Sequence, residues 1–153
     1  MDQSGQRMPQ NYMQIQFPSL SENESFARVA VAAFAAQLDP TMEQLTELKT
    51  AVSEAVTNAI IHGYESGVGE VRISCAIVDG RIDITVEDEG VGIPDLEQAR
   101  QPLYTSRPEL ERSGMGITIM ESFVDELQIE SRPGQGTRVV MRKQVAKPPV
   151  LHA

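Results

Sequence analysis

The chain has 153 residues, with 13 lysines and arginines against 22 aspartates and glutamates, and a formal net charge of −9 at pH 7. This length suits one domain with a substantial hydrophobic core, and the negative charge argues against nonspecific binding to nucleic acid or an anionic membrane. The single cysteine, Cys75, excludes an internal disulfide, and there is no cysteine–histidine cluster for zinc. No stretch approaches the ~20 apolar residues of a membrane span, and residues 1–11 lack a signal peptide's apolar core, so we expect a cytoplasmic protein.

The first predicted elements are a strand and a helix. Residues 12–17 alternate apolar and polar side chains, as a strand with one buried face does, and Pro18 ends the strand. Ser21 and Glu24 form an S-x-x-E capping box that begins a helix running to about Leu38. The predicted core stripe of this helix consists of Phe26, Val29, Ala30, Ala33, Phe34 and Leu38.

The other side of this first helix is also rather apolar. Val31, Ala32 and Ala35 lie there beside Arg28. The simpler interpretation of Arg28 is an ion pair with Glu24, four residues earlier. An arginine beside small apolar residues is also a common interface anchor, so we expect Arg28 to contact a partner protein.

A second helix is predicted from about Met42 to His62. Thr41 and Gln44 repeat the capping pattern, and Gly63 ends the helix. Its core stripe is formed by Leu45, Leu48, Val52, Val56, Ala59 and Ile60. Glu54, Asn58 and His62 recur at every fourth residue and form one polar line on the helix, which is either a solvated face or a binding site. His62 closes the helix and is interpreted as structural.

The second half of the chain predicts two hairpins and an irregular segment. Strands at 70–78 and 81–87 are joined by an Asp-Gly turn. A short helix begins at Pro94 and ends near residue 100, and the irregular stretch 101–113 is typical of a lid over a functional site. A helix at 116–126 and strands at 127–131 and 136–143 follow. The sequence therefore predicts an α/β (α+β) two-layer sandwich, with a mixed, mostly antiparallel sheet and helices on one face, over residues 11–143. Residues 1–10 and 144–153 are expected to be flexible tails.

Glu54 and Asn58 offer the chemistry of phosphoryl transfer. The Asn58 amide oxygen is a suitable ligand for Mg²⁺ when nucleotide phosphates and water supply the remaining ligands. Glu54, one turn earlier, could accept the proton of an attacking hydroxyl. The alternatives are a hydrogen-bonded helix amide for Asn58 and a capping or salt-bridge role for Glu54.

Two glycine-containing motifs complete the predicted site. Asp88 begins a D-x-G-x-G motif with Gly90 and Gly92, whose glycines let the backbone approach a flat ligand closely. The Asp88 carboxylate could accept a hydrogen bond from the exocyclic amine of adenine, which guanine does not present there. Ser113, Gly114, Met115 and Gly116 precede and open a helix whose free amides could bind phosphate. Arg112, with Arg107 as its competitor, could neutralise the γ-phosphate. A turn aspartate and a surface arginine are the simpler alternatives.

These motifs, in this order, resemble those of the GHKL ATPases and kinases, the family of DNA gyrase and the histidine kinases, whose ATP-binding domain has the Bergerat fold. Longer strings at 21–29, 37–42, 52–64 and 108–116 are similar to the anti-sigma kinases of endospore-forming bacteria. The resemblance covers about residues 11–143. It implies a homodimeric serine/threonine kinase that uses ATP and Mg²⁺, silences a sporulation sigma factor and phosphorylates a serine of an anti-anti-sigma protein.

Three alternatives remain within this resemblance. A histidine-kinase catalytic domain shares the motifs but needs a dimerisation hairpin with an acceptor histidine, for which the chain has no room. A general-stress anti-sigma kinase differs mainly in its partner. In a non-catalytic sigma-binding module, ATP only shapes the binding surface, and a test for phosphate transfer separates this module from a kinase.

Overall fold

The structure is a computed structural model, and it describes residues 8–63, 68–90, 116–132 and 134–146. The elements are, in chain order, β1 (Asn11–Pro18), α1 (Glu22–Ala35), the 3₁₀ turn η1 (Ala36–Leu38), α2 (Met42–Asn58), the π-helical turn η2 (Ala59–Gly63), β2 (Glu70–Val78), β3 (Arg81–Asp88), α4 (Gly116–Phe123), β4 (Glu126–Arg132) and β5 (Gly136–Gln144). The predicted short helix at 94–100 and the predicted lid at 101–113 lie outside the described residues.

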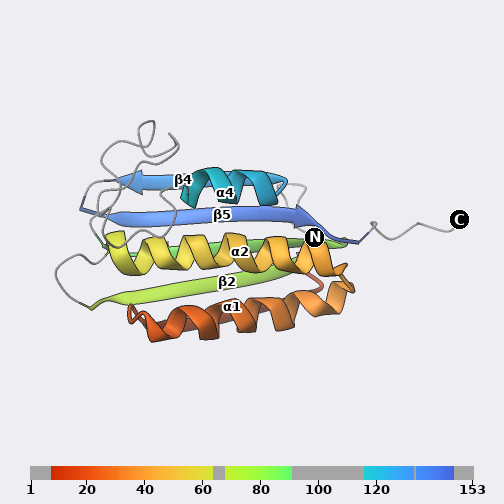
Figure 1. Ribbon diagram of the computed structural model, residues 1–153, viewed down its shortest axis with the longest axis horizontal. Coiled ribbons are helices and arrows are strands. Elements are labelled where there is room, and N and C mark those ends of the chain that lie inside the picture. Colours follow the sequence, from red (N-terminus) through yellow and green to blue (C-terminus); the bar gives the residue numbers. More distant parts are fainter. Residues whose placement is uncertain (1–7, 64–67, 91–115, 133, 147–153) are drawn as a thin grey trace, which may run out of the picture.

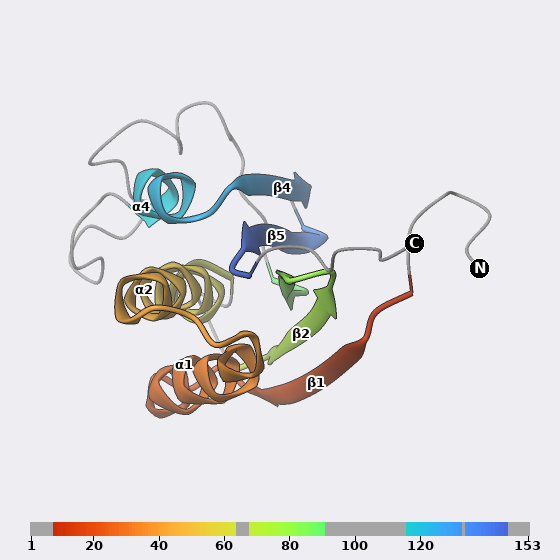
Figure 2. The ribbon, with the colours of Figure 1, turned by 90° about the vertical axis from the view of Figure 1, so that its right-hand side faces the viewer.

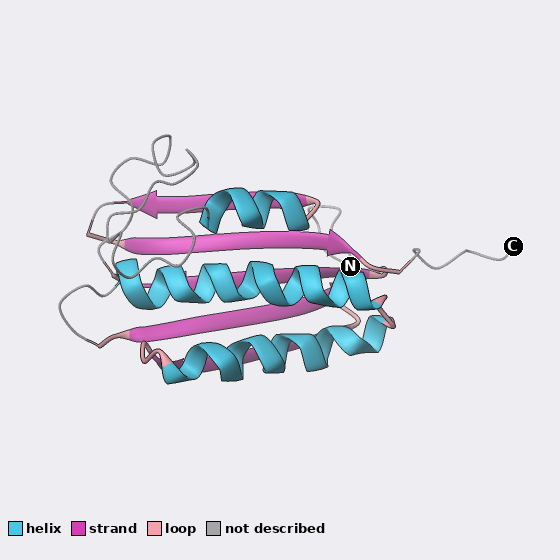
Figure 3. Ribbon diagram, in the orientation of Figure 1, coloured by secondary structure: helices cyan, strands magenta, loops and turns pink. Residues whose placement is uncertain are grey.

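The described strands form one sheet in the order β1-β2-β3-β5-β4, and all four neighbouring pairs are antiparallel. The helices α1, α2 and α4 lie side by side on one face of this sheet, and the opposite face carries no helix among the described residues (Figures 1 and 2). Figure 3, in which helices are cyan and strands are magenta, shows the two layers. The predicted two-layer architecture is therefore confirmed, with a sheet that is antiparallel throughout its described part rather than mixed.

The core lies between the two layers. On β2 and β3 every second residue is buried, so one face of each strand meets the helices. Helix α2 contributes Leu48, Ala51, Val52, Ala55 and Val56, which are at most 1% exposed and confirm the central part of its predicted stripe. Cys75 is buried on β2 as predicted, and burial raises the pKa of its thiol to about 12. Across the described residues, every helix is too short or too polar to cross a membrane.

The buried face of α1 differs from the predicted one. Phe26 and Val29 are each 58% exposed, whereas Val31 and Ala35, expected on the outer side, are buried together with Ala27. These three buried residues recur at every fourth position and are small, so α1 can approach α2 closely. The predicted core stripe of this helix is wrong in phase, although Phe34 and Leu38 do pack against the core.

The capping patterns give one confirmation and one correction. Thr41 and Gln44 form a complete capping box at the start of α2, with bonds of 3.1 and 2.9 Å between side chains and backbone amides. Ser21 makes no side-chain cap, because its hydroxyl bonds the neighbouring Glu22 carboxylate at 3.0 Å. The Glu24 carboxylate instead accepts a hydrogen bond from Ser53 of α2. Glu24 therefore joins two helices rather than closing the capping box.

The turn between β2 and β3 is tight. Asp79 and Gly80 have φ of 49° and 80°, the pair of positive values that a type I′ hairpin requires. The last described residues of the chain pack beside this turn, since the Val145 and Ala146 amides bond Gly80 O at 2.9 and 3.0 Å. Near the end of β2, just before the turn, Ile77 O accepts a hydrogen bond from the Gln10 amide at 2.8 Å. Residues 10, 145 and 146, just outside the predicted limits of 11–143, thus bond to the hairpin of β2 and β3.

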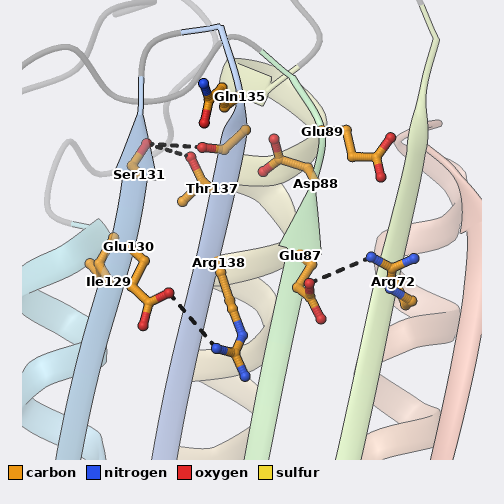
Figure 4. Close-up of a pocket in the computed structure, with 11 residues that line it drawn as sticks. Arg72, Glu87, Asp88, Glu89, Ile129, Glu130, Ser131, Gln135, Thr137 and Arg138 are labelled. Atoms are coloured by element: carbon orange, nitrogen blue, oxygen red, sulfur yellow. Dashed lines mark hydrogen bonds and ion pairs between the residues drawn. The ribbon is translucent and has the colours of Figure 1, made fainter.

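The helix-free face of the sheet carries a row of alternating charges. Arg72, Glu87, Arg138 and Glu130 stand opposite one another on β2, β3, β5 and β4 (Figure 4). Ion pairs join Arg72 to Glu87 at 3.5 Å and Arg138 to Glu130 at 3.8 Å. A second row joins Arg142 to Asp83 at 3.6 Å and to Glu126. Opposite charges in cross-strand positions stabilise a solvated sheet face.

Candidate functional site

Glu54 and Asn58 lie at the contact between α2 and α4. A Cβ atom added at Gly116, the first residue of α4, would lie 3.1 Å from Glu54 Oε2 and 3.3 Å from Asn58 Nδ2. The absence of a side chain at Gly116 therefore lets the N-terminus of α4 rest against both polar groups. Two of the three predicted motifs, far apart in the sequence, are thus brought together in space.

The helix that carries Glu54 and Asn58 changes its geometry directly after them. Helix α2 is α-helical up to Asn58, and η2 then makes one π-helical turn that ends at Gly63. The predicted helix from about Met42 to His62 is therefore confirmed, with a π-helical turn at its C-terminal end. Such π-helical turns are frequent at functional sites. The turn packs against β3 and β5, the strands that carry the next part of the site.

Asp88 ends β3 on the face of the sheet that meets the helices. It is 9% exposed, and its Oδ1 accepts a hydrogen bond from the Gly90 amide at 2.9 Å. Burial raises the pKa of its carboxyl to about 6, and hydrogen bonds from the backbone of Gly90 and Thr137 partly oppose that rise. The carboxylate is thus held in place by its own glycine loop, next to η2.

Gly136 and Thr137, at the start of β5, belong to the surroundings of Asp88 and were not predicted as site residues. Gly136 has φ of 89°, and a Cβ there would lie 2.1 Å from Asp88 O. Thr137 stands opposite Asp88 in the sheet, and its hydroxyl lies 2.9 Å from that of Ser131 on β4. A Gly-Thr pair in a strand is a weak signal in a single sequence, because only the register places it beside Asp88.

A cavity of about 600 Å³ opens at the same end of the sheet. Asp88 and Thr137 line it, together with Arg72, Glu87, Glu130 and Arg138 of the helix-free face (Figure 4). Glu54 and Asn58 are absent from its described lining. The cavity therefore reaches Asp88 from the sheet's open face and is separate from the contact between α2 and α4.

Several predicted site residues lie outside the described residues. They are Gly92, Arg107, Arg112, Ser113, Gly114 and Met115. The described part of the chain also contains no group of three histidine, cysteine, aspartate or glutamate side chains that could hold a metal. The predicted Mg²⁺ site does not require such a group, because its protein ligand is the amide of Asn58 and its other ligands are phosphate and water.

Arg28 lies on α1, away from these motifs. It is half-buried, and its Nε atom is buried without a hydrogen-bond partner in the structure as described. The ion pair with Glu24 that the spacing allows is not formed, since Glu24 bonds Ser53 instead.

The site has the parts of a nucleotide-binding site. A buried carboxylate that accepts hydrogen bonds ends β3, and an acidic group, an amide and a glycine at the positive end of a second helix meet between α2 and α4. Gly116 and Ile117 at the start of α4 are buried, and the missing Cβ of Gly116 lets its backbone lie beside Asn58. This arrangement suits phosphate oxygens and a hydrated Mg²⁺ ion.

Comparisons with known proteins agree with this description. Residues 17–143 match the family model of the histidine kinase-like ATPase domain. Proteins named anti-sigma F factor from Bacillus licheniformis and Geobacillus kaustophilus are each 64% identical over 142 residues, which cover 92% of this chain and 97% of each relative. One from Clostridium novyi is 61% identical, over 90% and 97% of the two chains. The crystal structure of the RsbU and RsbW domains of a Mycobacterium tuberculosis protein shares the fold, with a TM-score of 0.66 and 20% identity over 96% of this chain and 36% of that chain.

Proposed function

Because the chain belongs to the histidine kinase-like ATPase family and, within it, to the anti-sigma F factors, we propose that it binds and inhibits the sporulation sigma factor sigma F in the cytoplasm. We further propose that it is a serine kinase, which uses ATP and Mg²⁺ to phosphorylate and thereby inactivate an anti-anti-sigma factor. An ATPase domain implies ATP binding. The transfer of phosphate to a protein serine and the identity of the partner proteins go beyond ATP binding and are our proposal.

The contact of Gly116 with Glu54 and Asn58 is the observation that carries the kinase proposal. It places an acidic group and a neutral oxygen ligand beside the N-terminus of α4, where a γ-phosphate would be bound. Glu54 then accepts the proton of the substrate serine hydroxyl while that oxygen forms a bond to the γ-phosphorus. The bond between the β–γ bridging oxygen and the γ-phosphorus breaks, and ADP is the leaving group.

Asn58 and Asp88 serve binding in this proposal. Asn58 would hold Mg²⁺, which when bound offsets negative charge on the phosphate oxygens. Asp88, buried and held by the Gly90 amide, accepts a hydrogen bond from the adenine amine. Guanine presents a carbonyl there, so Asp88 would select ATP over GTP.

The residues outside the described part complete the proposed site. Gly92 belongs to the adenine loop, and Ser113, Gly114 and Met115 extend the phosphate-binding amides that begin α4. Arg112, or Arg107 in its place, would neutralise charge on the γ-phosphate. Replacing Arg112 by alanine is then expected to slow transfer more than it weakens ADP binding, since ADP lacks that phosphate.

Arg28 is the proposed contact with sigma F or the anti-anti-sigma factor. Arg28 is half-buried on α1 and lies in the sequence between the exposed Phe26 and Val29, which supports this role. The original reason, an exposed face of Val31 and Ala35, no longer applies because both residues are buried. Arg28→Glu should leave ATP binding and thermal stability unchanged and weaken partner binding at least tenfold, which surface plasmon resonance would measure. Full partner affinity in the reversed-charge protein would contradict the assignment.

One experiment tests the function as a whole. The purified chain is incubated with Mg-ATP and, separately, with sigma F, a general-stress sigma factor and the anti-anti-sigma factor of each system. We expect tight binding of sigma F alone among the sigma factors, and phosphoserine on the sporulation anti-anti-sigma factor. Binding without phosphoserine would support the non-catalytic module, and preference for the general-stress partners would support that branch of the family.

A further inference from the structure

Lys143 connects three elements of the fold from a buried position on β5. The residue is 9% exposed, and its Nζ donates a hydrogen bond to Phe123 O, the last residue of α4, at 2.9 Å. The same ammonium group lies 3.5 Å from Glu47 Oε2 on α2. A single positive charge thus joins the sheet to the C-terminal end of α4 and to the first half of α2.

The contact of Lys143 and the contact of Gly116 lie at opposite ends of the same helix pair. Along α2, Glu47 and Glu54 are separated by two helical turns, about 10 Å at a rise of ~1.5 Å per residue. Along α4, Gly116 and Phe123 are separated by the same number of residues and hence by the same distance. The two helices therefore lie alongside each other and are fixed at both ends, by Gly116 against Glu54 at one end and by Lys143 at the other.

We propose that Lys143 is a positioning residue for the phosphate-binding end of α4. By holding the C-terminus of α4 against β5 and α2, Lys143 sets the place of Gly116 and its neighbouring amides relative to Glu54 and Asn58. This inference rests on the proposed binding of ATP phosphates at that contact. In this proposal, binding of the ATP phosphates also requires a residue that touches neither the nucleotide nor the protein substrate.

The chemistry of the lysine contact favours a role in placement over one in stability alone. Carbonyls at a helix C-terminus lack partners within the helix, and a cation there complements the helix dipole. Burying an ammonium group is costly, and a hydrophobic side chain of the same size often gives equal stability. What a hydrophobic side chain cannot supply is a bond that fixes where α4 ends.

The test compares Lys143→Met, which keeps the length of the side chain and removes its charge, with the unchanged protein. Affinities for Mg-ATP and for adenosine are measured by NMR titration. We expect a loss of roughly tenfold in Mg-ATP affinity and a change below twofold for adenosine, because adenosine binds at Asp88 and carries no phosphate. Lys143→Arg, which restores a donor and a charge, should recover most of the Mg-ATP affinity.

Two controls separate positioning from general destabilisation. Lys49→Met makes the same change on α2 and should leave both affinities unaltered. Val31→Ala destabilises α1 through a cavity in the core, and should lower thermal stability without changing the ratio of the two affinities. If Lys143→Met does not fold, Glu47→Gln takes its place, with an expected loss of about threefold for Mg-ATP.

The outcomes distinguish the two proposals. If the unchanged protein binds Mg-ATP, and Lys143→Met keeps the same ratio of Mg-ATP to adenosine affinity, the positioning role is wrong while the proposed function stands. If the unchanged protein binds no Mg-ATP, the proposed function itself fails. A tenfold loss confined to Mg-ATP, with rescue by arginine, supports the role of Lys143.

Discussion

Glu54 and Asn58 face the same glycine from one helix, but their proposed roles differ, and so should the consequences of replacing them. Asn58→Ala should weaken Mg-ATP binding, because it removes a metal ligand. Glu54→Gln should keep nucleotide affinity and slow phosphate transfer by about 10²–10⁴-fold, because only the base is lost. Calorimetry gives the affinities and a phosphoserine assay gives the rates. An equal loss of binding in both variants would make Glu54 a structural residue.

Nucleotide binding should depend on pH through Asp88. Burial raises the pKa of its carboxyl to about 6, and the ionised form is the stronger acceptor for the proposed hydrogen bond from the adenine amine. We therefore expect ATP affinity to fall as the pH is lowered through 6, and the loss to be absent in Asp88→Asn, which is weaker at every pH. Titrations between pH 5 and 8 check this. A flat profile in the unchanged protein would remove Asp88 from the adenine contact.

The same residue should limit the stability of the empty protein. The folded pKa of about 6 lies above the ordinary 3.8, so between these values the folded state binds more protons than the unfolded state. The contribution of Asp88 to stability therefore decreases as the pH rises through this window and reaches its lowest value above pH 6. Asp88→Asn is expected to be more stable than the unchanged protein at pH 8, by on the order of 2 kcal/mol, and this advantage should shrink towards pH 4.5. Urea unfolding at the two pH values measures both differences, and an advantage that grows at low pH would contradict the expectation.

Among the larger elements, the turn between β4 and β5 allows two glycines to be compared directly. Gly134 and Gly136 both have positive φ, but a Cβ at Gly134 meets nothing within 4 Å, whereas one at Gly136 would lie 2.1 Å from Asp88 O. Gly134→Ala should lower the free energy of unfolding by about 1–2 kcal/mol, because a residue with a side chain is strained in the left-handed conformation. Gly136→Ala should cost more than ~3 kcal/mol, since β3 and β5 must separate there. Denaturation curves for the pair test this, and equal losses would contradict the proposed clash.

Sequence periodicity is sufficient to predict the buried face of α2, but it does not predict the buried face of α1. Helix α2 has charged and hydroxyl residues at Glu43, Thr46, Glu47 and Lys49, which leave one apolar stripe and fix the buried face. Helix α1 has alanines and valines on nearly every side, so several stripes are similarly apolar. Close packing of small residues against α2 selected the face of Ala27, Val31 and Ala35. That choice depends on helix-to-helix distance, which no local pattern contains.

At the scale of the whole molecule, the order of the motifs predicted which parts of the site would meet. Asn58 and Gly116 are separated by β2 and β3, and the sequence indicated their proximity only through the resemblance to a known family. Thr137, Gly136 and Lys143 could not be found in this way, because their neighbours are set by strand register and by the position where α4 ends. Sequence motifs thus predicted the chemical groups of the proposed site, whereas the residues that surround them became visible only in the fold.

The exposed apolar residues of α1 lead us to propose that the homodimer implied by the family resemblance forms through the N-terminal strand and helix. Phe26 and Val29 are each 58% exposed, and Tyr12 on the edge strand β1 is 74% exposed. Such residues are typical of a surface that a partner covers. A Phe26→Glu, Val29→Glu double variant should sediment as a monomer and keep its ATP affinity. As a control, Glu22→Gln on the same helix should leave the dimer intact, and a double variant that remains dimeric would place the interface elsewhere.

The charge rows on the open face of the sheet determine how the molecule presents its electric field. Each row alternates in sign, so this face contributes little net charge, while glutamates outnumber basic residues on α1 and α2. Within the described part, the helical layer therefore carries an excess of negative charge on α1 and α2. A positively charged region of a partner protein is drawn towards that layer before any contact forms, and this attraction weakens as ionic strength rises. Arg28 and the exposed residues of α1 lie on the side to which the field directs an approaching partner.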